Sequence, residues 1–476
     1  MKTLIKINTY IYILFIFFLP FTAFGQMYKY IGVWSQNGSL IFLFFGILLN
    51  SIIYYLEYKT LKINRYVITF IIFIIAMYIS TLIMSIYFYY FNIVNDIKII
   101  KDSIFKLHTL AWILLSFYYV YSYIQTKKDI IVTLKTLLVS LLFLVFYGYI
   151  QIYSIYNSES MVFNIYMKLQ KILNYSWIEM VEGYNLIPQI LLHKRVILTN
   201  QEPSITAYAL QTIFFPFLIA SIIFKTSIFK DHYMANILLF IITLPILIFT
   251  FSSAGFIVLV IQLVIFSILI FYFDSTNIKR KIYILLITFF LMLIVFIFMT
   301  TQTFRINLEV ALKKILMSGS GEGSAATRYG TIIAGIKEFI DFPVFGVGLG
   351  NSKYFLANYI PQWALNSELI TYIQTKFALV PRSLWVRILC ETGIFGTIPL
   401  VYFIVTLTRS YIFELKKSNN KFVLFLVCSY IIYIISFFFH GFNLVAFFLV
   451  FQWAMLGFFV SAIDIIHHEA KPGIKT

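Results

Sequence analysis

The sequence predicts an all-α integral membrane protein that crosses the bilayer about twelve times. Of its 476 residues, 61% are hydrophobic and only 12% are charged, whereas soluble domains carry about 25% charged residues. A mean hydropathy of +0.91 over this length requires apolar segments along the whole chain. One core of ordinary size could not bury so much apolar surface. These observations exclude a water-soluble protein.

Twelve apolar runs are long enough to span a bilayer, which takes roughly 17 to 25 residues. They lie near residues 8–24, 39–56, 66–91, 107–124, 130–152, 204–224, 236–251, 254–273, 282–300, 384–407, 422–439 and 443–462. Most connections between them are short, and no repeat of two matching halves is visible. We therefore treat residues 1–476 as a single membrane domain.

The basic residues orient the predicted spans. Short loops on one side contain Lys59, Lys62, Arg65, Lys127, Lys128, Lys225, Lys230, Lys279, Arg280, Lys281, Arg409, Lys416, Lys417 and Lys421. Short loops on the other side contain little more than Lys29, Lys98, Lys101 and Lys106. Cytoplasmic loops are enriched in Lys and Arg, so both termini are predicted to be cytoplasmic. The net charge of +17 thus reports topology rather than nucleic-acid binding.

Residues 1–25 have two interpretations. Lys2 and Lys6 precede an apolar stretch and Ala23-Phe24-Gly25, a pattern shared by cleavable signal peptides and retained spans. We favour a retained span because the apolar run is long for a signal peptide and eleven spans would be a less usual count. Cys390 and Cys428 lie in or beside apolar segments and are interpreted as packing residues.

Two predicted outer segments, residues 153–203 and 301–383, are too long to be simple connectors. The first mixes charged and aromatic residues and is interpreted as an amphipathic segment at the membrane interface. The second is the largest extramembrane piece and contains the most informative motifs. Extended loops often carry function, so this segment is the expected location of a site.

The large outer segment is predicted to contain an amphipathic helix. Apolar residues recur at helical spacing at Ile332, Ile333, Ile336, Phe339 and Ile340. Thr327 is predicted to cap the start of this helix and Pro343 to end it. Arg328 would lie in the first turn, where a cation opposes the helix dipole. Such a placement suggests an anionic ligand, with a solvated loop arginine as the alternative.

Two further stretches follow this helix. Phe345–Asn351, FGVGLGN, is predicted to form a tight turn with unusual backbone angles, not a nucleotide-binding loop, because no βαβ pattern surrounds it. Arg387 and Glu391 are four residues apart and share one face of the tenth span. They form either an internal ion pair or a polar lining at the outer edge of a cavity.

A carboxylate opens the sixth span. Glu202 precedes Pro203, and Arg195 lies seven residues earlier. Glu202 is either an ordinary N-terminal residue favoured by the helix dipole or a carboxylate available to a sugar hydroxyl at the membrane surface.

These motifs together resemble the O-antigen polymerase and O-antigen ligase superfamily, the Wzy-type polymerases and their relatives. The resemblance covers about residues 195–400 and is carried by Arg328 with the helix after it, Asp341–Asn351 (DFPVFGVGLGN), Ile388–Gly396 (ILCETGIFG), Glu202–Leu210 (EPSITAYAL) and Thr250–Leu259 (TFSSAGFIVL).

The resemblance implies a GT-C-like glycosyltransferase of the bacterial inner membrane with a periplasmic active face. In this family a growing O-antigen or other surface polysaccharide passes from undecaprenyl or another polyprenyl pyrophosphate to a sugar hydroxyl. The acceptor is the next lipid-linked repeat unit. The resemblance implies no metal or other cofactor, since the pyrophosphate is already a leaving group. Implied partners are the polyprenyl-pyrophosphate-linked oligosaccharide, membrane lipids and a chain-length regulator protein, but no nucleic acid.

The sequence departs from the family pattern in two places. Members commonly show an arginine in the turn matched here by Ser252–Gly255, where this chain has Ser253, so no role of that arginine is carried over. Ligases that act on the lipid A core place a histidine near the position of Arg382, but no histidine occurs between residues 302 and 439. The second departure favours a polymerase over a ligase acting on lipid A core or protein.

Arginine suits the implied chemistry because its planar fork binds phosphate oxygens and remains charged. We take Arg328 as the first candidate catalytic residue and Glu202 as a weaker one, an orienting group or general base. Candidate pyrophosphate- or glycan-binding residues are Arg195, Arg382, Arg387 and Glu391. A flippase or other transporter is the alternative from a different class. It would need charges inside several spans, whereas most of these spans are nearly charge-free.

Overall fold

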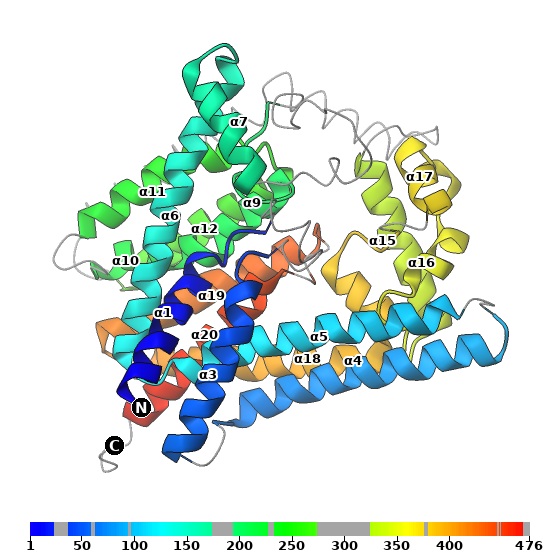
Figure 1. The fold of residues 1–476 in the computed structure, drawn as a ribbon, viewed down its shortest axis with the longest axis horizontal. Coiled ribbons are helices and arrows are strands. Elements are labelled where there is room, and N and C mark those ends of the chain that lie inside the picture. Colours follow the sequence, from blue (N-terminus) through cyan, green and yellow to red (C-terminus); the bar gives the residue numbers. More distant parts are fainter. Residues whose placement is uncertain are drawn as a thin grey trace.

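The computed structural model describes residues 1–22, 37–58, 62–93, 97–173, 194–226, 233–273, 324–375, 379–444, 447 and 449–469. Within these ranges the chain consists of helices and their connections, without strands (Figure 1). The longer helices are α1 (Lys2–Phe17), α3 (Leu40–Tyr58), α4 (Arg65–Tyr90), α5 (Lys98–Tyr123), α6 (Lys127–Tyr156), α7 (Met161–Leu173), α10 (Phe215–Phe224), α11 (Tyr233–Ile248), α12 (Ser253–Phe273), α15 (Ser324–Asp341), α17 (Ser367–Thr375), α18 (Leu384–Lys417), α19 (Lys421–Gly441) and α20 (Val450–Glu469). Shorter helices are α9 (Pro203–Ala209), η3 (Leu210–Phe214), α16 (Ser352–Phe355), η4 (Leu356–Tyr359) and η5 (Gln362–Ala364).

A polytopic membrane protein is confirmed. Eight helical segments of the described chain are long and apolar enough to cross a membrane, namely Arg65–Tyr90, Ile99–Tyr123, Lys127–Tyr156, Pro203–Phe224, Ser253–Phe273, Leu384–Lys417, Lys421–Gly441 and Val450–His468. Two predicted spans appear as shorter apolar helices, Leu40–Leu56 and Met234–Ile248. The predicted span 282–300 lies outside the described residues, and the first apolar helix ends at Phe17. The count of twelve therefore stays a prediction.

Aromatic packing holds the bundle together. Helix α4 packs against both α5 and α18, and α5 also packs against α20. At the centre, the rings of Phe70 and Phe117 stack with centroids 4.1 Å apart, and Trp453 is fully buried beside Phe70. Helices α15, α16 and α17 gather at one end of the layer formed by α4, α5 and α18 (Figure 1). These three helices come from the predicted large outer segment.

The last helix begins later than predicted. The apolar run was expected to form a helix from residue 443, but α20 begins at Val450. Asn443 lies in the turn after α19, and its side chain accepts a hydrogen bond from Arg328. Hydropathy alone could not locate this boundary because the residues after Asn443 are apolar whether or not they are helical.

Helix α18 is broken at Gly393, which has φ +62° and ψ −164°. Because of this break, the backbone N–H of Ile394 donates to the carbonyl of Pro343 (2.9 Å) rather than to the carbonyl of Cys390. The Cys390 carbonyl instead accepts from the N–H of Val347 (2.9 Å). The glycine-rich turn thus satisfies backbone groups that the break leaves unpaired, which an apolar environment requires.

The prediction of a tight turn with unusual backbone angles is confirmed. Gly346, Gly348 and Gly350 have φ values of +63°, +89° and +79°. A Cβ atom on Gly346 would lie 2.4 Å from the carbonyl oxygen of Cys390, so the two backbones could not approach with any larger residue there. The turn and the Cys390–Gly393 segment, which the sequence offered as separate motifs, form one structural unit.

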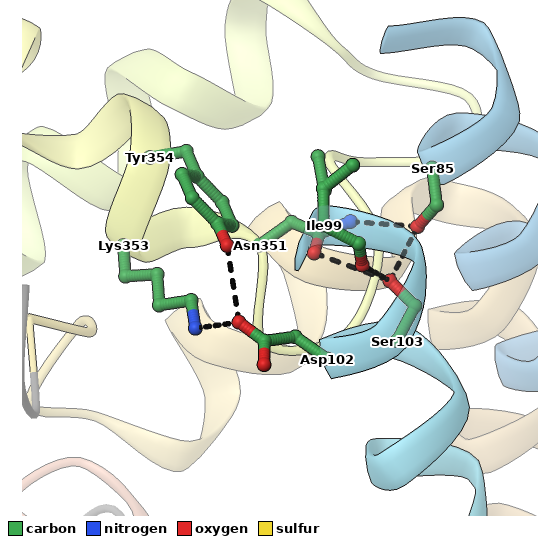
Figure 2. Close-up of polar contacts among 7 residues, drawn as sticks. All are labelled: Ser85, Ile99, Asp102, Ser103, Asn351, Lys353 and Tyr354. Atoms are coloured by element: carbon green, nitrogen blue, oxygen red, sulfur yellow. Dashed lines mark hydrogen bonds and ion pairs between the residues drawn. The ribbon is translucent and has the colours of Figure 1, made fainter. Parts of the chain in front are cut away.

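Polar contacts anchor this unit to the first part of the chain (Figure 2). Asn351 Nδ2 donates to Ser85 Oγ of α4 (3.0 Å). Lys353 forms an ion pair with Asp102 of α5, and the Tyr354 hydroxyl donates to the same carboxylate (3.0 Å). The glycine-rich turn and α16 are therefore held in a defined position against α4 and α5.

Candidate functional site

Helix α15 carries Arg328 and begins earlier than predicted. Its first residue is Ser324, so Thr327 is not the N-cap and Arg328 is not in the first turn. The Thr327 hydroxyl instead bonds to the side chains of Asn366 and Glu368 (3.2 and 3.1 Å). The prediction that Arg328 opposes the helix dipole from the first turn was therefore wrong. The end of the helix agrees with prediction, at Asp341 shortly before Pro343.

Arg328 is held between two parts of the fold. Its Nη1 atom donates to Asn443 Oδ1 (2.9 Å), which links α15 to the turn between α19 and α20. Burial lowers the pKa of the Arg328 guanidinium, Glu202 acts in the opposite direction, and Arg382 lowers it further. An arginine stays charged under such conditions because its ordinary pKa exceeds about 12. Arg328 is thus a partly buried permanent cation.

Arg195 links the segment before α9 to the turn before α12 through hydrogen bonds. Its Nε and Nη2 atoms donate to the carbonyls of Thr250 (2.8 Å) and Phe251 (3.0 Å). This is the turn in which the sequence has Ser253 where family members commonly show arginine. Burial lowers the pKa of Arg195, Arg328 lowers it further, and Glu202 raises it. Arg195 and Arg328 are therefore near enough for their charges to interact.

Glu202 and Arg382 complete this group. Glu202 is the N-cap residue of α9, and its exposed carboxylate accepts a hydrogen bond from Ser204 (3.1 Å). The guanidinium of Arg382 lies over the ring of Tyr372, 5.1 Å from the centroid. We call Arg195, Arg328 and Arg382 the arginine group. The structure thus brings together three predicted cations and the predicted carboxylate from three segments, around residues 195–202, Arg328 and Arg382.

The two remaining predicted site residues form a separate contact. Arg387 Nε and Glu391 Oε2 form an ion pair at 3.1 Å, with side-chain exposures of 4% and 0%. The pair lies beside the glycine-rich turn, since the Glu391 carbonyl accepts from the N–H of Gly348 (2.8 Å). Of the two interpretations offered by the sequence, this geometry matches the internal ion pair. Their role in substrate binding stays a prediction.

Glu338 is a buried carboxylate that the sequence analysis missed. It lies on α15, is 0% exposed and accepts a hydrogen bond from Ser352 Oγ (2.9 Å). Burial raises its pKa from 4.5 to about 8, and the Ser352 bond lowers it in part. The available signal was an acid among the apolar positions Ile336, Phe339 and Ile340, directly after Lys337. It was overlooked because such a position is more often exposed.

The pKa of Glu338 predicts a pH-dependent stability. Between about pH 4.5 and 8 the folded protein keeps a proton that the unfolded chain releases, so stability should fall as pH rises through this window and stay low above it. We expect Glu338→Gln to flatten the dependence of Tm on pH in detergent and to raise Tm above pH 8. Glu159→Gln, at an exposed carboxylate, is the control. A Glu338→Gln curve parallel to wild type would contradict this expectation.

The arginine group offers cations to an anion at the end of the bundle. The charges of Arg195 and Arg382 each interact with that of Arg328, and Glu202 compensates this positive charge only in part. Arg forks match phosphate oxygens in geometry. The arrangement therefore suits a phosphate-containing ligand held by arginines.

Comparison with known families bears on this site directly. Residues 238–401 match the family described as O-antigen ligase. The match confirms the resemblance to the O-antigen polymerase and ligase superfamily, and it contains Arg328, Arg382, Arg387 and Glu391. Arg195, Glu202 and Asn443 lie outside the matched O-antigen ligase segment. A comparison with curated proteins finds no match.

The superfamily match supports an enzyme of surface polysaccharide biosynthesis with O-antigen polymerase or ligase activity. Together with the eight apolar helices, it supports a multi-pass membrane protein. Residues 174–193, 301–323 and 376–378 of the two predicted long loops lie outside the described residues. The candidate site is accordingly defined by the arginine group, Glu202 and the residues that hold them.

Proposed function

We propose that this protein is a bacterial inner-membrane polysaccharide polymerase. It would transfer a glycan from polyprenyl pyrophosphate to a sugar hydroxyl of the next lipid-linked repeat unit at the periplasmic face. The proposal rests mainly on Arg328, a partly buried cation in the O-antigen ligase segment. Glu202 and Arg382 act on the pKa of Arg328, and Arg328 in turn lowers the pKa of Arg195. A lipid pyrophosphate is the anion that this family's reaction provides.

The proposed chemistry is a displacement at the anomeric carbon. The acceptor hydroxyl oxygen attacks that carbon, the bond from carbon to the phosphate oxygen breaks, and polyprenyl pyrophosphate leaves with the electron pair. The hydroxyl proton passes to the exposed carboxylate of Glu202. Arg328 binds the pyrophosphate and stabilises the negative charge that grows on it, while Arg195 and Arg382 support its binding. This step requires no metal or nucleotide sugar.

An exposed apolar stripe on α15 supports this location. Tyr329, Ile333, Ile336 and Ile340 are 50%, 37%, 42% and 65% exposed and follow one another at helical spacing. A helix with an exposed apolar face is stable in the plane of a membrane surface, with its apolar side among the lipid chains. Arg328 would then lie at headgroup level, where the pyrophosphate of a polyprenyl lipid also lies.

The absence of an outer-segment histidine supports a polymerase over a ligase. No histidine occurs between residues 302 and 439. The next one, His440, is 0% exposed and its Nε2 atom is 2.8 Å from Gln211 Oε1. A histidine bonded inside the helix bundle is poorly placed to act on a substrate at the surface. Transfer to lipid A core or protein is the second candidate function, favoured by the description of the matched family.

Analysis of lipid-linked intermediates in a deletion strain tests the proposed function. We expect long polysaccharide chains to disappear and single repeat units on polyprenyl carrier to accumulate at the outer face, with recovery on complementation. Long chains that persist on the polyprenyl carrier would instead identify a ligase. Repeat units retained at the inner face would overturn the enzymatic proposal in favour of a flippase.

A further inference from the structure

A cavity of about 430 Å³ lies at the other end of the α4–α18 pair from α15. Arg65, at the start of α4, and Arg409, near the end of α18, both line it. Both belong to the basic residues that predict the cytoplasmic side. The cavity is therefore remote from the arginine group and plays no part in the proposed transfer.

Both arginines present positive charge to this cavity. Arg65 Nη2 donates to the hydroxyls of Tyr66 (2.6 Å) and Ser410 (3.1 Å), which fixes the position of its guanidinium. Within the described part of the chain, Arg409 forms no hydrogen bond or ion pair, and it is exposed. The two cations line the same cavity without a carboxylate between them.

The neighbouring carboxylates are engaged elsewhere. Glu414 is 5% exposed and lies 3.5 Å from His467 Nε2, which also lines the cavity. Asp464 accepts hydrogen bonds from Asn64 Nδ2 (2.5 Å) and from the Tyr121 hydroxyl (3.1 Å). Neither acid lines the cavity, so the charge facing a ligand is positive.

One wall of the cavity is apolar and faces outward. Tyr402 and Phe413 line it on α18 and are 58% and 59% exposed. They lie eleven residues apart, on the same helix face as Arg409. Basic pockets between membrane helices bind anionic lipid headgroups, and an adjacent exposed apolar wall can contact the acyl chain of the same lipid. A free phosphate would use the arginines but not this wall.

We infer that this cavity binds an anionic glycerophospholipid of the cytoplasmic leaflet. Its phosphate lies between Arg65 and Arg409, and one acyl chain follows Tyr402 and Phe413. The bound lipid links the start of α4 to the end of α18, so it stabilises the packing of these two helices. The inference is independent of the proposed function, because it concerns only the end of the bundle opposite to Arg328.

The test is thermal unfolding and native mass spectrometry of the full-length protein in neutral detergent. Phosphatidylglycerol should raise Tm and remain bound, whereas phosphatidylcholine and glycerol 3-phosphate should do neither. Arg65→Gln with Arg409→Gln should weaken phosphatidylglycerol binding about tenfold or more. The control is Lys128→Gln with Lys135→Gln on α6, which removes two exposed charges elsewhere and should bind as wild type does.

The double variant also removes the hydrogen bonds of Arg65 to Tyr66 and Ser410, so it could lose binding through misfolding. A single variant at Arg409 separates the two effects. Arg409→Gln removes no hydrogen bond or ion pair within the described chain and should still weaken phosphatidylglycerol binding several-fold. Equal binding by wild type and both arginine variants would overturn the inference. Equal stabilisation by glycerol 3-phosphate would identify a free-phosphate site instead, and equal binding of phosphatidylcholine would show that charge is not recognised.

Discussion

Arg328→Ala is expected to abolish the surface polysaccharide ladder, with a loss of transfer rate of about 100- to 1,000-fold. The variant removes the cation that would bind the pyrophosphate and stabilise its charge as it leaves. Arg328→Lys should also be severely impaired, since a lysine ammonium cannot bind two phosphate oxygens through a rigid fork. The measurement is a gel of surface polysaccharide from a deletion strain complemented at equal protein level.

Two variants separate a catalytic role of Arg328 from general damage. Lys337→Ala removes an exposed cation from the same helix and should leave the ladder unchanged. Asn443→Ala removes the side chain that accepts the bond from Arg328 and should lower activity less than Arg328→Ala does. If Arg328→Ala and Arg328→Lys both give a wild-type ladder, Arg328 is not a site residue.

Glu391→Gln is expected to lower the free energy of unfolding by about 3–5 kcal/mol, because it leaves the Arg387 charge buried without its carboxylate. Replacing both partners, as Arg387→Met with Glu391→Leu, should recover most of this loss, since hydrophobic residues of similar volume often substitute for a buried pair. Thermal unfolding in detergent measures both effects.

The same double variant decides the role of the pair. If Arg387 and Glu391 only hold α18 in place, the stable double variant should still produce the polysaccharide ladder. A double variant that folds with wild-type stability but produces no ladder would show that the pair binds substrate, as its position in the family motif suggested. Ser418→Ala, at the far end of α18, is a control for mutation of this segment.

Composition and the spacing of apolar runs were sufficient to predict a helical membrane protein and most of its spans. This worked because a helix in lipid must satisfy its backbone internally and present apolar side chains, and both demands are local. Positive φ values at Gly346, Gly348 and Gly350 were predictable for the same reason, since only glycine adopts them readily. The motif order also led to the superfamily that the family comparison supports.

Helix boundaries were less predictable. The sequence predicts Thr327 as a cap because threonine often caps helices. In the structure its hydroxyl forms hydrogen bonds with Asn366 and Glu368, and the helix already includes Ser324. The start of α20 was missed because apolar residues before Val450 look like a span. At Thr327, bonds to the distant side chains of Asn366 and Glu368 replace the local cap.

The packing of the helices determines which candidate residues lie close together. It joined Arg195, Arg328, Arg382 and Glu202 in one charged group, and it placed Arg387 and Glu391 in a buried pair. The tertiary structure also revealed the backbone hydrogen bonds between the glycine-rich turn and the break in α18, and it showed that Glu338 is buried. Local sequence carries the residue types needed for phosphate chemistry, but distances between segments depend on how the helices pack, which no local pattern encodes.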